Sequence, residues 1–268
     1  MNSQQELPAH TGFNGREFRL CECIGRSVLN EEVISLDFAW EGPAPKAGQF
    51  FLLRPQRTSV FLGRPLSAAG WNLRRSKSRP VEPGILEFIL AIRGKGTKEL
   101  ADLRPGEKAF LTGPLGRGWL EVSGAQRPGK TALVSGGVGI APLAFFAQEQ
   151  GGLVDFYAGF RSKPFCLENI KAQRIIIASE DGCAGHKGRI PDFFVPDNYD
   201  AVFTCGPESM LRTIAKKCRA KGVKCYVSLE RHMACGTGAC LGCTVETGSG
   251  NRRCCSDGPV FDAEDIFA

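Results

Sequence analysis

Leu133-Val-Ser-Gly136-Gly137-Val138-Gly139-Ile140-Ala141-Pro142-Leu143 is an apolar strand that runs through a turn of glycines directly into a helix. Such a turn exposes backbone N–H groups, and together with the positive end of the helix it suits a pyrophosphate. The signal is not specific by itself, because a tight turn from strand to helix needs glycine with or without a ligand, and this is not the G-x-G-x-x-G fingerprint. The stretch does indicate a fold in which strands and helices alternate.

The segments around this turn continue the alternation. Beyond a polar junction at 125–130, apolar segments predict strands, and two helices are predicted over 142–149 and 208–221. Strands that alternate with helices form parallel βαβ units. We therefore predict a parallel α/β nucleotide-binding domain over residues 126–228, with strands at 131–135, 153–158, 175–178, 201–204 and 223–228.

A second glycine segment, Thr204-Cys205-Gly206-Pro207, also follows a strand and opens a helix. Ligands of open parallel sheets bind beyond the carboxyl ends of the strands, so two such loops can frame one dinucleotide. A purely structural role of both turns is the alternative. The predicted dinucleotide site comprises Gly136, Gly137, Val138, Gly139, Pro142, Cys205, Gly206 and Pro207.

The first part of the chain has a different pattern. Its segments are short, rich in residues that favour strands and separated by glycine or proline, as in an antiparallel barrel. A single helix is predicted among them, at 97–103, where Pro105 stops it. We predict an N-terminal antiparallel β-barrel over residues 1–125, with strands at 18–24, 32–38, 49–53, 65–69, 86–92 and 108–111.

Two segments of this barrel carry groups that suit a flavin nucleotide. Arg64-Pro65-Leu66-Ser67 places a fixed cation and a hydroxyl around a rigid dipeptide, so Arg64 suits a phosphate and Ser67 suits the edge of a flavin ring. The helix start at Gly96-Thr97 offers N–H groups to a second phosphate. The alternatives are a solvated arginine and a helix start capped by Thr97.

Five of the twelve cysteines crowd into the end of the chain. Cys235-Gly-Thr-Gly-Ala-Cys240-Leu-Gly-Cys243 is followed by eleven residues and then Cys255, which is the C-x4-C-x2-C…C spacing of a plant-type [2Fe–2S] centre. The glycines at 236, 238 and 242 allow the backbone to wrap closely around the inorganic core. Structural zinc, which favours two C-x2-C pairs, and a set of free cysteines are the alternatives.

The spacing does not choose between Cys254 and Cys255 as the fourth ligand. We predict a C-terminal [2Fe–2S] module over residues 229–268, which has little apolar periodicity and is expected to depend on its inorganic centre for folding.

Charge and hydropathy exclude several classes of protein. There are 34 Lys and Arg against 28 Asp and Glu, a net charge of +6, and because these charges are scattered, nucleic-acid binding is not indicated. No 18-residue apolar run predicts a membrane span, and the first ten residues lack the layout of a secretory signal. We expect a soluble cytoplasmic protein. His186 and His232 stand in no catalytic arrangement, so we predict no acid–base catalytic residue.

In their order along the chain, these motifs resemble the electron-transfer subunits of the NAD-dependent dihydroorotate dehydrogenases, within the ferredoxin–NADP reductase superfamily. The resemblance covers nearly the whole chain. Its most specific part is the cysteine tail with the run Cys255-Ser-Asp257-Gly-Pro-Val-Phe261, which selects Cys255 over Cys254. The other matching segments are 64–67, 96–98, 113–116, 136–139 with 141–142, and 205–207.

The resemblance implies three cofactors and a partner. FAD would bind the barrel at Arg64, Pro65, Leu66, Ser67, Ile89, Leu90, Ala91, Gly96 and Thr97. NAD would bind the glycine turns, and the cluster would be held by Cys235, Cys240, Cys243 and Cys255. An FMN-containing catalytic subunit would oxidise dihydroorotate, in a heterotetramer with two copies of each subunit, as a step of pyrimidine biosynthesis.

Some features depart from the family pattern. Leu66 replaces an aromatic residue that many superfamily reductases stack on the flavin, and an extra basic loop lies at 71–80. Arg161 and Lys163 are two cations that would suit the 2′-phosphate of NADP. Two other functions remain open: a flavin and iron–sulfur reductase that serves another acceptor, such as ferredoxin or a sulfite or sulfide reductase, and a redox-sensing module without turnover.

Overall fold

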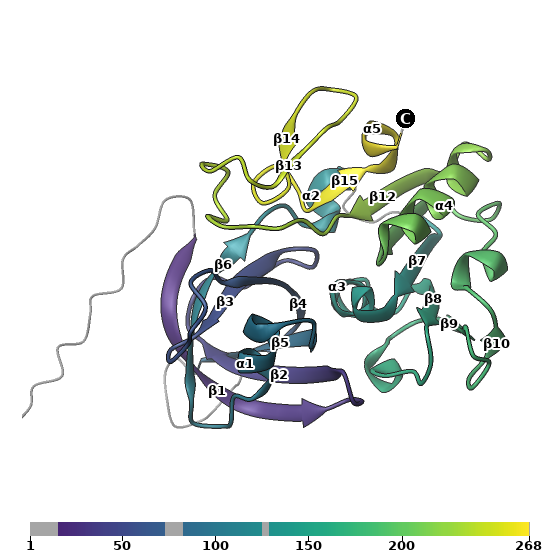
Figure 1. Ribbon diagram of the computed structural model, residues 1–268. Coiled ribbons are helices and arrows are strands. Elements are labelled where there is room, and N and C mark those ends of the chain that lie inside the picture. The colour runs from purple at the N-terminus through teal and green to yellow at the C-terminus, as the bar shows by residue number, and fades with distance from the viewer. Residues whose placement is uncertain (1–15, 73–82, 125–128, 268) are drawn as a thin grey trace, which may run out of the picture.

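A computed structural model describes residues 16–72, 83–124 and 129–267. Figure 1 shows an N-terminal barrel beside an open parallel sheet, with the C-terminal segment lying across the top of both. The predicted fold class, a barrel followed by a parallel α/β domain and a cysteine-rich C-terminal segment, is confirmed. Most of the basic loop predicted at 71–80 lies outside the described residues.

The barrel closes in the strand order β1-β2-β5-β4-β3-β6, and all neighbouring strands are antiparallel. Its interior is filled by aromatic side chains that contact each other edge to face, Phe38, Phe51 and Phe88, none of which is exposed. The strands are β1 (Glu17–Val28), β2 (Val33–Trp40), β3 (Phe50–Pro55), β4 (Arg64–Asn72), β5 (Gly84–Ala91) and β6 (Lys108–Leu115).

The prediction of a single helix in this part of the chain is wrong. The structure has α1 (Lys95–Ala101) between β5 and β6, and also the short helix α2 (Trp119–Ser123) after β6. With five residues, α2 is too short to produce an apolar period in the sequence. Its Trp119 is fully buried between Phe146 and Phe203, so α2 packs the end of the barrel against the parallel sheet.

The second sheet has the order β10-β9-β8-β7-β11-β12-β15. All neighbouring strands are parallel except the last pair, β12 and β15. The strands are β7 (Thr131–Gly136), β8 (Val154–Phe160), β9 (Arg174–Ser179), β10 (His186–Lys187), β11 (Ala201–Cys205), β12 (Lys224–Ser228) and β15 (Val260–Asp262). The helices of this region are α3 (Ile140–Glu149), α4 (Glu208–Arg219), η2 (Gly137–Gly139), η3 (Leu167–Asn169) and η4 (Ile190–Phe193).

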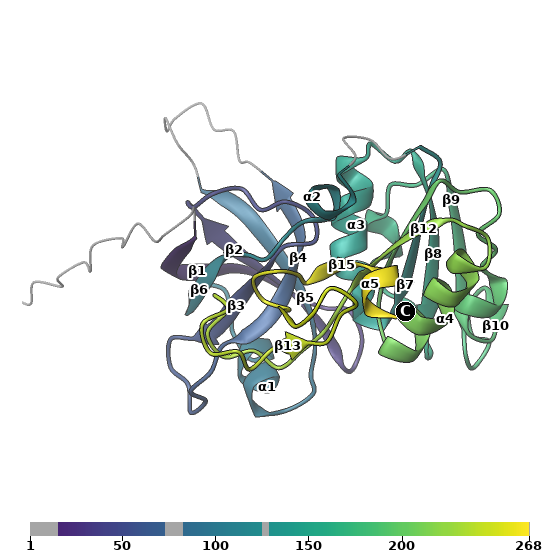
Figure 2. The ribbon, with the colours of Figure 1, turned by 90° about the horizontal axis from the view of Figure 1, so that it is seen from above.

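The C-terminal segment is joined to both other parts. It contains the small hairpin of β13 (Thr244–Val245) and β14 (Arg252–Arg253), then β15 and the short helix α5 (Ala263–Ile266). Because β15 pairs with β12, this segment completes the parallel sheet. Figure 2 shows the same segment passing over the barrel. The domain boundaries at 125/126 and 228/229 stay predictions.

The barrel and the sheet meet where the predicted ligand segments lie. Strand β4 packs against α3, and β5 approaches η2, the turn of glycines. At the C-terminal end of α3, the Glu149 carboxylate accepts a hydrogen bond of 3.1 Å from the Ala47 N–H, which precedes β3 of the barrel. In the part of the chain described here, no helix has the length and apolar character to cross a membrane.

Candidate functional site

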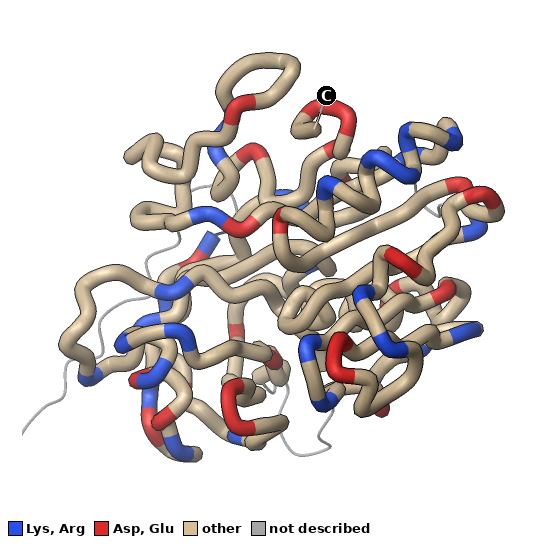
Figure 3. The backbone as a smooth tube through the Cα atoms, turned by 45° about the vertical axis from the view of Figure 1, so that its right-hand side comes forward, with Lys and Arg blue, Asp and Glu red and all other residues tan. Residues whose placement is uncertain are grey.

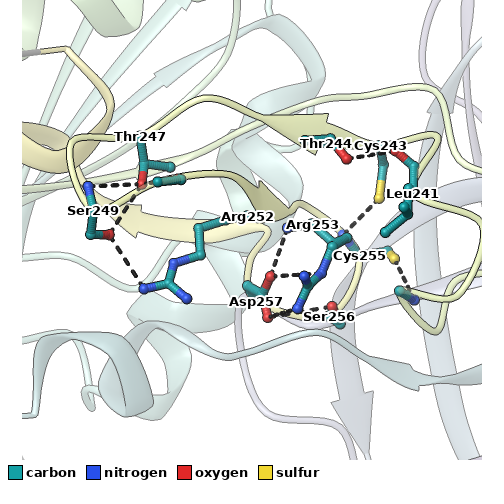
Figure 4. A network of polar contacts seen from close by, with 12 residues as sticks. Leu241, Cys243, Thr244, Thr247, Ser249, Arg252, Arg253, Cys255, Ser256 and Asp257 are labelled. Carbon is teal, nitrogen blue, oxygen red and sulfur yellow. Dashed lines mark hydrogen bonds and ion pairs between the residues drawn. The ribbon is translucent and has the colours of Figure 1, made fainter.

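The four predicted cluster ligands lie in two pairs. The Cys235 sulfur accepts hydrogen bonds from the N–H groups of Thr237 at 3.4 Å and Cys240 at 3.5 Å. The Cys243 sulfur accepts one from the Cys255 N–H at 3.4 Å. The two pairs are joined because the Cys255 sulfur accepts a hydrogen bond of 3.1 Å from the Gly238 N–H, as Figure 4 shows.

The arrangement in two pairs suits a [2Fe–2S] centre. In a [2Fe–2S] centre with four cysteines, each iron takes two thiolates, so ligands in pairs suffice. Burial opposes ionisation of Cys235, but the N–H groups of Cys240 and Thr237 outweigh it and lower the pKa of this thiol to about 6. The residues present therefore fit the cluster.

Cys254 makes a different contact from the four predicted ligands. Its thiol is fully buried and donates a hydrogen bond of 3.4 Å to the Leu229 carbonyl. Burial raises the pKa of Cys254 to about 12 and that of Cys255 to about 12 as well, so the hydrogen bond to Leu229, and not the pKa, separates the two cysteines. This geometry supports Cys255 as the fourth ligand.

The cysteine loop rests directly on the barrel. A Cβ atom at Gly236 would lie 2.9 Å from Cδ1 of both Leu52 and Leu115, so the loop backbone lies directly on these two leucines, and its φ of 71° favours glycine there. Leu52 belongs to β3 and is paired with Pro65 of β4. The cluster loop therefore lies one strand away from the predicted flavin segment. The sequence does not single out the two leucines, because this contact joins residues more than 100 positions apart.

Arg253 and Asp257, which lie on either side of Cys255 in the sequence, form an ion pair. The Asp257 carboxylate accepts a hydrogen bond of 2.6 Å from the Arg253 N–H and lies 3.1 Å from the Arg253 Nε atom (Figure 4). In return the Asp257 N–H donates to the Arg253 carbonyl at 2.8 Å. These bonds close a tight turn around Cys255 and so hold its sulfur toward Gly238.

The structure brings two of the predicted FAD residues together. A Cβ atom at Gly96 would lie 2.3 Å from the Arg64 Nε atom, so the guanidinium lies against the start of α1. The Arg64 Nε atom is buried and has no hydrogen-bond partner among the described residues. A buried donor without a partner costs free energy, so this atom is suited to an anionic ligand such as a phosphate. Arg64 and Gly96 therefore fit the pyrophosphate of FAD.

The other predicted FAD residues take different positions. Thr97 is the third residue inside α1 rather than its cap, and its hydroxyl accepts hydrogen bonds from the N–H groups of Arg93 and Gly94. Ile89 and Leu90 have buried side chains, so a flavin contact by them would use the backbone. Pro65, Leu66, Ser67 and Ala91 are half-buried on β4 and β5.

The two glycine segments of the nucleotide domain are in direct contact. Strands β7 and β11 are neighbours, with Ser135 opposite Cys205. The strands that follow β7 in sequence lie on one side of this pair, and those that follow β11 lie on the other side, so the strand order reverses between β7 and β11. A Cβ atom at Gly206 would lie 2.9 Å from the Gly136 N atom. Crevices at such a switch point bind nucleotides in open α/β sheets. Val138 lies in the turn of glycines, and Pro142 lies in the first turn of α3.

Gly139 holds these segments together, and Gly139→Ala is expected to destabilise the protein by about 1–3 kcal/mol because the site is overpacked. The new Cβ atom would lie 2.2 Å from the Cys205 carbonyl oxygen, which belongs to the backbone and cannot rotate away. Chemical denaturation measures the effect. Gly94→Ala is the control, because its Cβ would meet no atom within 4 Å. Equal stability of the two variants would contradict the close approach.

A carboxylate that the sequence analysis does not single out lies beside Cys205. Burial, and next the charge of Glu230, raise the pKa of the Cys205 thiol to about 12. Glu230 follows β12, so the rule that ligands bind beyond the carboxyl ends of strands could have found it. His186 stacks on Phe193, and His232 is exposed in the linker before the cysteine loop.

A barrel followed by a parallel sheet, with the candidate flavin, nucleotide and cysteine segments along one interface, is the architecture of the ferredoxin–NADP reductase class. The solved structure of an NADH-dependent reduced ferredoxin-NADP oxidoreductase, reported in connection with flavin-based electron bifurcation, has a TM-score of 0.75 at 26% identity and covers 92% of this chain and 90% of that chain. A ferredoxin NADP+ reductase from Neisseria gonorrhoeae with bound FAD and NADP has a TM-score of 0.58 at 16% identity, with 81% of this chain and 95% of that chain covered. The second likeness concerns the fold alone.

Comparison with known sequences identifies the family within this class. The family model for the iron-sulfur cluster binding domain of dihydroorotate dehydrogenase B matches residues 230–267. The electron transfer subunit of dihydroorotate dehydrogenase B (NAD(+)) from Clostridium acetobutylicum is 38% identical, with 83% of this chain and 86% of the relative covered. Its counterpart from Clostridium perfringens is 36% identical, with 82% and 86% covered. The chain belongs to the family of the electron-transfer subunits of dihydroorotate dehydrogenase B.

Proposed function

We propose that this chain carries electrons from a dihydroorotate-oxidising FMN subunit to NAD⁺. The observation that carries the proposal is the position of the paired cysteines, on the barrel beside the predicted flavin strand, which itself adjoins the glycine turns. When bound, the cluster supplies one-electron transfer, and FAD converts single electrons into the hydride that NAD⁺ accepts. The protein is an oxidoreductase subunit, and its proposed place is the cytoplasm.

The role of this chain's own residues is to bind the two nucleotide cofactors and to orient them. Arg64 and the turn at Gly96 would hold the FAD phosphates, and Ser67 would face the flavin ring. The segment from Gly136 to Gly139 would hold the pyrophosphate of NAD, and Cys205 to Pro207 would border the nicotinamide. A buried neutral thiol at Cys205 fits a packing role there rather than proton transfer. No residue is assigned as a general acid or base.

The family name implies a catalytic partner subunit. We propose that this partner binds FMN and oxidises dihydroorotate, and that the complex contains two copies of each subunit. The barrel, the sheet and the cysteine segment account for the described residues, which supports a separate subunit as the place of the FMN and the dihydroorotate pocket.

Reconstitution tests this function. The chain alone is expected to oxidise NADH with artificial acceptors such as ferricyanide but not to oxidise dihydroorotate. Mixed with the FMN subunit of the same organism, it should give dihydroorotate-dependent NADH formation. Cys240→Ser is expected to abolish this coupled reaction and to keep the reaction of NADH with a two-electron dye. Dihydroorotate oxidation by the isolated chain, or undiminished coupling in the variant, would contradict the proposal.

A reductase that serves ferredoxin is the second candidate, favoured by the likeness to the NADH-dependent reduced ferredoxin-NADP oxidoreductase. The two functions differ in the acceptor. If NADH reduces ferredoxin through this chain faster than the FMN subunit delivers electrons from dihydroorotate, the second function holds.

The nucleotide is expected to be NAD, with kcat/KM at least tenfold higher for NADH than for NADPH in ferricyanide reduction. Arg161 and Lys163 follow β8 and are exposed, which by itself would suit a 2′-phosphate. However, the Asp181 N–H donates to the Arg161 carbonyl at 3.4 Å, so the backbone of a segment with two acidic residues, Glu180 and Asp181, lies beside this loop. Carboxylates repel a phosphate and accept a hydrogen bond from a ribose hydroxyl. A higher kcat/KM for NADPH would reverse the assignment.

A further inference from the structure

A hollow of about 550 Å³ lies at the edge of the parallel sheet opposite to the glycine turns. Lys130 precedes β7, Asp155 lies near the start of β8, and Arg174 begins β9, whereas the turn of glycines follows the end of β7. Because β7 has six residues, about 17 Å of strand separate the hollow from this turn. The hollow is therefore separate from the proposed dinucleotide site. Its complete lining is Lys130, Asp155, Tyr157, Gln173, Arg174, Phe193, Val195, Asn198 and Tyr199.

A network of polar side chains holds Arg174 at this hollow. The Tyr199 hydroxyl donates a hydrogen bond of 2.7 Å to the Asp155 carboxylate and lies 3.0 Å from the Tyr157 hydroxyl. The Arg174 Nη2 atom donates to the Asp155 carboxylate and to the Tyr199 hydroxyl, both at 2.9 Å. Burial raises the pKa of Tyr199, so this phenol stays neutral. The network therefore fixes the position of the guanidinium without an excess of negative charge.

The same network leaves two donor atoms of Arg174 for a ligand. Its bonds to Asp155, Tyr157 and Tyr199 all start at Nη2, and the bond to Tyr157 is 3.3 Å long. The Nε and Nη1 atoms make no hydrogen bond with the described part of the chain, and the side chain is 58% exposed. An arginine that is already held in place loses little conformational freedom when it binds an anion. The guanidinium therefore suits an anionic group of a ligand.

Lys130 is the second cation of the hollow. Its Nζ atom lies 5.5 Å from the centroid of the Tyr199 ring, which places the amine beside the same network. Two more carboxylates lie nearby but outside the lining. Asp200 accepts a hydrogen bond of 2.7 Å from the Lys130 N–H, and Asp197 is paired with Lys221 at 2.6 Å. The lining itself carries two cations and one carboxylate, so one positive charge remains for a ligand.

We propose that this hollow binds a nucleoside monophosphate whose phosphate contacts Arg174 and Lys130. Its volume falls in the range of pockets for small ligands, about 300–1,000 Å³. Figure 3, in which the parallel-sheet domain is turned forward, shows basic and acidic residues interspersed over this domain. Without a large patch of one charge in this view, a nucleic acid has no surface to follow, so the ligand is a small molecule. The proposal goes beyond the proposed function, because the hollow includes no residue assigned to FAD, NAD or the cluster.

The rest of the lining suits the nucleoside. Phe193 and Val195 offer an apolar side for the sugar and the base, and Val195 is 56% exposed. Gln173 and Asn198 carry amides, which both donate and accept hydrogen bonds, as the edge of a base requires. A free phosphate would use the cations alone. A nucleoside monophosphate uses the whole lining.

Titration calorimetry with UMP tests this site on the chain loaded with FAD and the cluster. UMP lacks the adenine ring that FAD and NAD share, and NAD⁺ is kept at saturation so that the probe cannot occupy the dinucleotide site. We expect a Kd of about 1 mM or lower, and an increase of about tenfold or more in Lys130→Gln. Lys171→Gln is the matched control, because Lys171 is an exposed lysine just before β9 and outside the lining. It should bind UMP as the unaltered chain does, and both variants should keep the rate of ferricyanide reduction by NADH.

A second variant makes the test independent of Lys130. Val195→Asp places a carboxylate at an exposed position of the hollow, outside the polar network, and should also weaken UMP binding by about tenfold or more because like charges repel. Absence of UMP binding by the unaltered chain, an unchanged Kd in either variant, or an equal loss in Lys171→Gln would overturn the proposal. If inorganic phosphate binds as tightly as UMP, the hollow is a simple anion site and the nucleoside assignment is wrong. None of these outcomes bears on the electron-transfer function, which reconstitution tests separately.

Discussion

Serine in place of Cys235, Cys240, Cys243 or Cys255 is expected to abolish the paramagnetic resonance signal of the reduced [2Fe–2S] cluster. Each of these sulfurs belongs to one of the two pairs, and each iron depends on both members of its pair. The hydroxyl of serine is a harder and more basic ligand than a thiolate. Because none of residues 237–242 is buried in the core, loss of the cluster should also lower the melting temperature.

Cys254→Ser is the matched control. It neighbours Cys255 in sequence, but its thiol is bonded to the Leu229 carbonyl in the core. The hydroxyl of serine can donate the same bond, so the cluster signal should persist at full intensity. Iron and sulfide analysis gives a second measurement for all five variants. A signal that survives in Cys255→Ser and disappears in Cys254→Ser would reverse the choice of the fourth ligand.

Short segments rich in strand-forming residues, separated by glycine or proline, were sufficient to predict the barrel strands. They did not predict that β15 completes the parallel sheet. That pairing joins residues 226–228 to 260–262 across the whole cysteine segment, and a strand of three residues carries too little pattern to be recognised. The helix α2 was not predicted either, because it is also too short to carry a recognisable pattern, although its Trp119 is among the largest fully buried side chains.

At the site, the sequence indicated residue types but not the contacts between them. Spacing identified four sulfurs and left Cys254 open, and the direction of the Cys254 thiol is a property of the fold. Likewise, the packing of Gly236 on Leu52 depends on how the cysteine loop meets the barrel. Contacts between segments that are distant in the sequence leave no pattern in the neighbouring residues, so they could not be predicted from the sequence.

Arg64→Gln is expected to weaken FAD binding by about ten- to a hundredfold, which corresponds to about 1.5–3 kcal/mol for hydrogen bonds to a charged group. The buried Nε atom of Arg64 has no partner in the described protein, and the guanidinium lies on Gly96 at the start of α1. Glutamine keeps a polar side chain but loses the charge and the planar fork that matches a phosphate. Flavin content after gel filtration and the Kd of FAD from flavin fluorescence measure the loss.

Arg54→Gln separates a specific contact from a general loss of positive charge. Arg54 is the last but one residue of the adjacent strand β3, and its guanidinium lies over the Phe110 ring, 5.2 Å from the centroid. This variant should bind FAD as the unaltered chain does, and both variants should keep the cluster signal, because neither residue contacts the cysteine loop. If Arg64→Gln retained full flavin content, the phosphates would have to lie elsewhere on the barrel. If both variants lost FAD equally, the effect would be one of overall charge, and Arg64 would have no special place in the flavin site.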